Sequence, residues 1–150
     1  MATDARAGVT RRTDDWTPAR LFLAVSAGFH VLVGVAGLAV DQSFPIGSDD
    51  AAHAGSGHVF GILETNGWHS TAALLVAVYS LYFAVRHERA RDAALALGIA
   101  HVGIFLGLAI GSPSTFWLAS NAADQAVHAS TAIGGIGTAL LTRSTRALTT

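Results

Sequence analysis

Four long apolar segments constrain this chain more than any other feature of its sequence. They run from about Leu21 to Val40, Trp68 to Val85, Ala93 to Gly111 and Ala122 to Leu141. Each is close to the roughly 20 residues that a helix needs to cross a hydrocarbon core of about 30 Å. Backbone polar groups in lipid must be satisfied inside the protein, which favours helices. The sequence therefore predicts an all-α fold, an integral membrane four-helix bundle.

Composition supports this class and excludes others. Only 13% of the 150 residues are charged and 51% are hydrophobic, whereas soluble domains carry about a quarter charged residues. A net charge of −1 gives no indication of a nucleic-acid partner. The absence of cysteine excludes disulfides, thiolate metal sites and a cysteine nucleophile. The expected partners are the lipid bilayer and either a second copy of the chain or another membrane protein.

The segment boundaries carry helix-capping residues. We expect helices at about 19–40, 67–85, 93–111 and 122–141, within a transmembrane domain spanning 18–141, with tails at 1–17 and 142–150 and an outer loop at 41–66. Asn66 and Asn121 precede the second and fourth segments as N-caps, and Asp124 takes the N3 position after Asn121. Asp92 is placed to cap the third segment.

The arginines predict the orientation. All nine basic residues are arginine: four precede the first segment, three lie between the second and third, and two follow the fourth. The positive-inside rule then places both termini in the cytoplasm, in a cell (inner or plasma) membrane. A cleaved signal peptide ending after Ala39 is the alternative, but the first apolar run exceeds the usual 7–15 residues and contains His30.

The two halves of the chain resemble each other. Trp68–Ala73 echoes Val127–Ala132, and Phe60–Asn66 echoes Phe116–Asn121. Two helices per unit return the chain to the side where it began. We therefore predict two repeated helical hairpins in parallel orientation, related by an axis along the membrane normal.

These motifs also indicate a family. Asn66-Gly67-Trp68-His69, and Asn121 through Asp124 to His128, resemble the four-helix membrane family catalogued as domain of unknown function 4383. The resemblance covers roughly Thr17 to Leu141. The Gly/Asp/His-rich loop Asp41–Gly57 departs from the family pattern. The resemblance implies the same topology and leaves the activity open.

Four histidines, one on each segment, are the main functional clue: His30, His69, His101 and His128. His30 and His101 lie about 15 Å from the outer ends of their helices at 1.5 Å rise per residue, and ionisable residues at such depth usually face the bundle interior. Three interpretations remain open. The imidazoles could hydrogen-bond between helices, ligate a b-type haem or a metal, or relay protons.

Two further sets of residues are candidates. Asp49, Asp50, His53 and His58 in the outer loop could bind a divalent cation, or could belong to a solvated loop. Small residues at helical spacing predict close helix packing, either within the bundle or between copies of the chain. They are Gly103, Gly107 and Gly111 on the third segment, and Ser130 and Gly134, with Ala126, on the fourth.

No catalytic motif is present, so we expect no enzymatic activity. The leading hypothesis is a non-enzymatic accessory or scaffold component of the membrane, with no cofactor expected. The alternative is a redox subunit that binds haem b or a divalent metal through its helix-borne histidines. The third hypothesis is a small proton-coupled transporter.

Overall fold

The computed structural model describes residues 16–46, 57–110 and 117–142. These residues form the four predicted helices: α1 (Pro18–Val40), α3 (Gly67–Ala84), α4 (Ala90–Ile110) and α5 (Ala122–Leu141). Two short strands, β1 (Gly57–Val59) and β2 (Leu63–Thr65), precede α3. The all-α prediction is correct for the bundle but missed this small hairpin.

The helix N-termini follow the predicted capping chemistry. The Asn66 side chain accepts from the backbone N–H of His69 at 2.9 Å. Asn121 and Asp124 form a reciprocal capping box at the start of α5. The prediction for Asp92 is wrong: α4 begins at Ala90, so Asp92 lies within its first turn, where a carboxylate still favours the helix dipole.

The β-hairpin is antiparallel, with Gly57 opposite Thr65 and Val59 opposite Leu63. Ile62 N–H donates to the carbonyl oxygen of Val59 across a turn. The two central residues of that turn, Phe60 and Gly61, both have positive φ, as a type I′ turn requires. This tight turn reverses the chain directly in front of α3.

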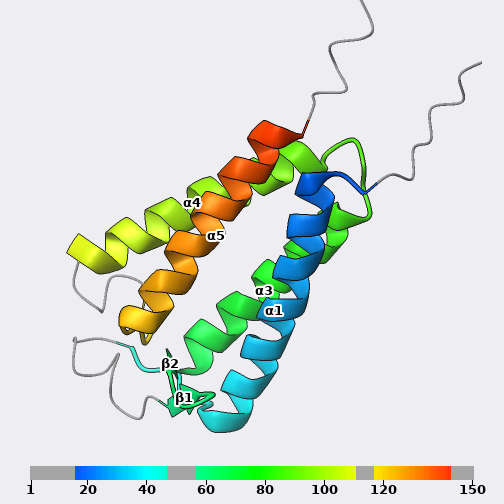
Figure 1. Cartoon of the computed structure of the whole chain (residues 1–150). Coiled ribbons are helices and arrows are strands. Elements are labelled where there is room, and N and C mark those ends of the chain that lie inside the picture. The colour runs from blue at the N-terminus through cyan, green and yellow to red at the C-terminus, as the bar shows by residue number, and fades with distance from the viewer. Residues whose placement is uncertain (1–15, 47–56, 111–116, 143–150) are drawn as a thin grey trace, which may run out of the picture.

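The helices pack as two sequential pairs. Contacts are densest between α1 and α3 and between α4 and α5, with fewer between the pairs. We call the end at which α3 and α5 begin the cap end, and the end at which α1 and α4 begin the tail end. Figure 1 shows the two pairs meeting at the tail end and diverging toward the cap end.

Small apolar residues close the tail end. A buried cluster, the tail-end core, draws on all four helices and consists of Ala19, Leu23, Ala84, Ala90, Ala93, Ala94, Leu97 and Ala139. Six of these eight residues are alanines, which let the helix backbones approach closely.

The predicted small-residue stripes make little of this contact. Nothing lies within 4 Å of where a Cβ on Gly103 would stand, and Ser130 is exposed. Gly107 is half-buried, Gly111 lies outside the described residues, and Gly134 meets only the ring of Phe22 on α1. The expectation of bundle packing through the Gly103 face is therefore wrong for Gly103.

The close approach between α4 and α5 uses other glycines. A Cβ on Gly135 would stand 2.6 Å from the carbonyl oxygen of Ala94 and 2.8 Å from the Cα of Gly98. Gly98 in turn faces the backbone of Ile136. These glycines are spaced for backbone contact, whereas Gly103 has turned away from α5.

The helices carry large apolar side chains on the outside and polar ones on the inside. Exposed examples occur on all four helices and include Leu21, Val35, Leu75, Val78, Leu81, Ile99, Ile133 and Leu140. Buried polar side chains include Ser26, Ser70, Ser80, Asp124 and three histidines. In the part of the chain described, α1 and α4 are long and apolar enough to cross a membrane; α3 and α5 carry more of the polar interior.

Candidate functional site

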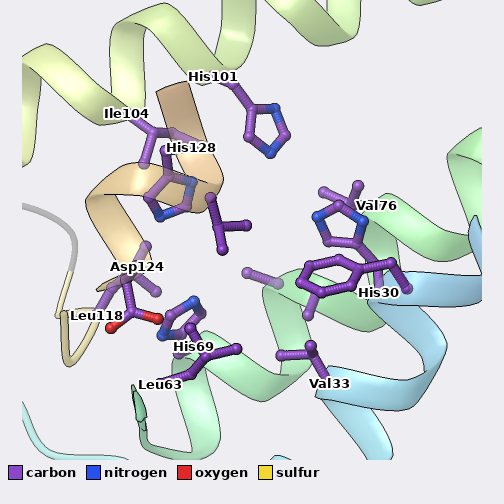
Figure 2. Close-up of a pocket in the computed structure, with 14 residues that line it drawn as sticks. His30, Val33, Leu63, His69, Val76, His101, Ile104, Leu118, Asp124 and His128 are labelled. Carbon is purple, nitrogen blue, oxygen red and sulfur yellow. The ribbon is translucent and has the colours of Figure 1, made fainter. Parts of the chain in front are cut away.

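The four helix-borne histidines come together in the space between the two helix pairs. Ring centroids are 5.8 Å apart for His30 and His101, 5.5 Å for His101 and His128, and 6.1 Å for His69 and His128. Figure 2 shows each ring reaching the same interior region from a different helix. We call these four residues the histidine cluster.

Three of the four imidazoles are held by the same kind of hydrogen bond. Nδ1 of His30 lies 2.8 Å from the carbonyl oxygen of Ser26, and Nδ1 of His101 lies 3.0 Å from that of Leu97. Nδ1 of His69 lies 2.7 Å from the carbonyl oxygen of Ala119. A carbonyl can only accept, so Nδ1 carries the proton in each ring. Nε2 is then left with its lone pair available.

His128 is different. Its side chain is 7% exposed, and neither ring nitrogen has a hydrogen-bond partner. A buried polar group without a partner costs roughly 1–3 kcal/mol. Such a group in a native fold calls for an explanation, and a role in ligand binding is one.

A cavity of about 50 Å³ adjoins the cluster. All four histidines and Asp124 line it, together with apolar side chains such as Val33 and Leu63 (Figure 2). A volume of this size accommodates a few water molecules or a single ion. Among the described residues, no three histidine or acidic side chains already converge closely enough to hold a metal ion.

Polar contacts continue from the cluster toward the tail end. Ser26 Oγ lies 3.2 Å from Nδ1 of His30, and Ser80 Oγ donates to Ser26 Oγ at 3.4 Å. Beyond this point the interior is filled by the tail-end core, in which Leu23 and Ala84 are almost fully buried. The polar interior therefore extends from the cap end and stops short of the tail end.

The two helix pairs exchange hydrogen bonds at the cap end. Asn66, the N-cap of α3, donates from Nδ2 to the carbonyl oxygen of Trp117 at 2.9 Å. Asn121, the N-cap of α5, donates from Nδ2 to the carbonyl oxygen of Ile62 at 2.8 Å. In each case the acceptor lies four residues before the other N-cap. We call this reciprocal pair of bonds the cap exchange.

The next residues repeat the pattern. Asp124, three residues after Asn121, accepts from the backbone N–H of Glu64 at 3.1 Å. His69, three residues after Asn66, donates to Ala119. Glu64 and Ala119 each lie two residues before an N-cap. The cap exchange therefore places two cluster-lining side chains, His69 and Asp124, at matching positions.

Of the four predicted loop metal ligands, the structure describes only His58. Asp49, Asp50 and His53 lie outside the described residues. His58 is exposed on β1, opposite Glu64, and does not line the cavity. That cation site stays a prediction.

Sequence reasoning identified the four histidines, both N-caps and Asp124, but missed two features. One is Ser80, which extends the polar interior beyond Ser26. The other is the cap exchange between the helix pairs. The echo between Phe60–Asn66 and Phe116–Asn121 was the available signal for it.

Comparison with known proteins gives a family and no further relative. The model of one family, described as a domain of unknown function, matches residues 20–141. No curated protein and no solved structure matches the chain. The match spans all four helices and every member of the histidine cluster. The chain belongs to the family catalogued as domain of unknown function 4383.

Proposed function

We propose that this chain is a four-helix integral membrane protein, with both termini cytoplasmic, that holds a small ligand without catalysis in its histidine cluster. The observation that carries the proposal is the inverted distribution of side chains. Large apolar groups cover the outside, and histidine, serine and aspartate line the inside. A bilayer accommodates that outer surface, and polar groups within membrane helices characteristically face the interior.

The arginines support this orientation. Arg20, Arg86, Arg89 and Arg91, the described arginines, all lie at the tail end or in the turn between α3 and α4. The cap end carries Glu64 and Asp124 instead. The positive-inside rule then places the tail end in the cytoplasm and the cap end outside. In this arrangement the histidine cluster extends from the outer face, at His69, to about the middle of the membrane, at His30 and His101.

The closed tail end favours a binding compartment over a transport path. A proton or ion path needs polar groups or water across the whole membrane. Here the polar interior ends at Ser26 and Ser80, and the tail-end core follows. Ligand exchange therefore occurs through the cap end. Reconstituted protein that conducts protons across vesicles would contradict this conclusion.

The cap exchange supports the parallel repeat. A two-fold axis between the pairs, along the membrane normal, would carry Asn66 onto Asn121 and Ile62 onto Trp117. In this register His69 corresponds to Asp124. The sequence echo instead aligns His69 with His128, which is a shift of four residues. We therefore infer a duplication whose N-cap segments retain the original register.

Single cysteines test the membrane arrangement cleanly, because the chain has none of its own. Leu75→Cys lies on α3 with 66% of the wild-type side chain exposed, so a water-soluble protein would react rapidly there. We expect no reaction with a membrane-impermeant maleimide. Ile62→Cys in the β-hairpin should react in intact cells, and Glu88→Cys only after permeabilisation.

A fourth variant tests the compartment. Ala72 lines the cavity, so Ala72→Cys should react with Ag⁺, a single thiol-reactive ion, applied from outside, and a bulky maleimide should react much more slowly. Rapid labelling of Leu75→Cys would overturn the membrane proposal. An inert Ala72→Cys would overturn the compartment.

A further inference from the structure

We propose that the ligand of the histidine cluster is a single first-row transition-metal ion of the zinc or copper class, bound through imidazole nitrogens. This inference rests on the proposed binding function and identifies its ligand. It follows from the protonation of the rings, their spacing, the unpartnered His128 and the size of the cavity.

The ring protonation is the one that metal ligands have. Metal-binding histidines usually donate their second ring N–H to a backbone carbonyl or carboxylate, which fixes the tautomer and orients the ring. His30, His69 and His101 each make such a bond from Nδ1. Three separate carbonyl groups, on α1, on α4 and in the segment before α5, thus prepare three Nε2 lone pairs beside one cavity.

The spacing is close to that of coordinated imidazoles. With metal–nitrogen bonds of about 2.0–2.1 Å, two imidazoles on one tetrahedral ion have ring centroids about 5 Å apart. The three neighbouring pairs in the cluster are separated by 5.5, 5.8 and 6.1 Å. Neighbouring rings must therefore approach by up to about an ångström. The rings at the two ends of the series, His30 and His69, must also turn toward the shared ion, because no three of these side chains converge on one point among the described residues.

His128 is the side chain that can close this gap. It neighbours both His69 and His101, so it connects His69 to the pair formed by His101 and His30. No hydrogen bond holds its ring, and its two nitrogens are buried. A metal bond would satisfy one of them, and rotation of the ring breaks no hydrogen bond. In the metal-free protein, His128 then lacks a hydrogen-bond partner because its ring nitrogen serves to bind the metal ion.

The cavity and the donor set select the class of ligand. The cavity that all four histidines line, of about 50 Å³, is too small to enclose haem or another organic cofactor. Imidazole nitrogens suit zinc, copper, nickel and iron, whereas magnesium and calcium require oxygen ligands. Asp124, which also lines the cavity, supplies negative charge beside the ion.

The test uses full-length protein purified in detergent through a tag without histidine. Chelator-stripped protein is titrated with Zn²⁺, Cu²⁺ and the spectroscopic probe Co²⁺. We expect one ion per chain, unaffected by excess Mg²⁺ or Ca²⁺. X-ray absorption or Cu²⁺ electron paramagnetic resonance should detect at least three imidazole nitrogens around the ion.

Matched variants assign the site. Loss of a second-shell partner typically weakens metal binding about 10–100-fold, so His101→Leu and His128→Leu should weaken it by more. His87→Leu, the same change in the turn between α3 and α4 at the tail end, should leave the affinity unchanged. The wild-type spectra decide the issue even if a cluster variant fails to fold.

Two results would overturn the metal assignment: no stoichiometric binding of any of the three ions, or equal loss of binding in His87→Leu. The thiol-labelling pattern is independent of both. If Leu75→Cys is protected and Ala72→Cys reacts but no metal binds, the metal assignment is wrong and the membrane compartment stands. Rapid labelling of Leu75→Cys would reject the membrane proposal, whatever the metal does.

Discussion

The two ends of the bundle are built from different chemistry. At the tail end, small apolar side chains from four helices fill the interior. Hydrogen bonds there join separate helices, from Ala19 N–H to Thr142 Oγ1, from Arg20 Nε to the carbonyl oxygen of Ala84, and from Tyr79 Oη to the carbonyl oxygen of Ala93. At the cap end, polar side chains cross between the pairs and surround a cavity. The tail end is therefore a packed apolar core, whereas the cap end forms a polar cavity that can bind a ligand.

This difference separates stability from function within one short chain. Helix association in lipid depends on close packing, because lipid supplies no hydrophobic drive. Close contact at the tail end holds the two pairs together. The pairs can therefore leave a cavity between them where the histidine cluster lies. Changes at the tail end should therefore cost the most stability, and changes in the cluster the least.

The largest effect is expected at the contact between α4 and α5. Gly135→Val would place a side chain against the backbone of Ala94 and Gly98, neither of which can move without shifting a helix. We expect a loss of about 3 kcal/mol or more in unfolding free energy, measured by denaturant titration in detergent. Gly137→Val is the matched control, because nothing lies within 4 Å of its Cβ position. Equal losses in both variants would refute the contact.

The next effect tests the tail-end core. Leu23 is 0% exposed, whereas Leu21 on the same helix is 57% exposed. Leu23→Ala should cost about 2–3 kcal/mol, toward the low end for buried leucine because part of the usual transfer energy is missing in lipid. Leu21→Ala should change the unfolding free energy by less than about 0.5 kcal/mol. A similar cost for both would mean that the tail end is loosely packed.

The cap exchange should contribute less, and cooperatively. Asn66→Ala and Asn121→Ala each remove an N-cap and one bond between the pairs, for an expected loss of about 1–3 kcal/mol. In a double-mutant cycle the two losses should couple by at least about 0.5 kcal/mol, because the bonds lie side by side and secure the same two segments. Strictly additive losses would show that each asparagine acts only on its own helix.

Sequence reasoning identified the apolar segments, the helix caps and the four histidines, because each can be recognised from residues close together in the chain. The depth of the histidines within the apolar segments also predicted that they face inward. It did not predict which glycines meet: Gly98 and Gly135 contact each other, while Gly103 does not contact α5. That choice depends on how the helices cross and rotate. The cap exchange was missed for a similar reason, since its partners are more than 50 residues apart.

The smallest effect on stability carries the most information about the site. His101 and His128 are both buried, but only His101 has a hydrogen bond to lose, the one from Nδ1 to Leu97. His101→Leu should therefore lower the unfolding free energy of the metal-free protein by about 1 kcal/mol. His128→Leu removes two unpartnered nitrogens and keeps the volume, so it should leave stability unchanged or raise it by about 1 kcal/mol.

Metal should reverse the order of stability of the wild type and His128→Leu. A ligand that binds only the folded state stabilises it in proportion to its affinity, so saturating Zn²⁺ should stabilise the wild type and leave His128→Leu almost unaffected. The wild type would then become the more stable protein, although it is the less stable or equal one without metal. If His128→Leu is strongly destabilised in metal-free protein, His128 has a structural partner at the cap end, and the contrast between a packed end and an end held ready for a ligand fails there.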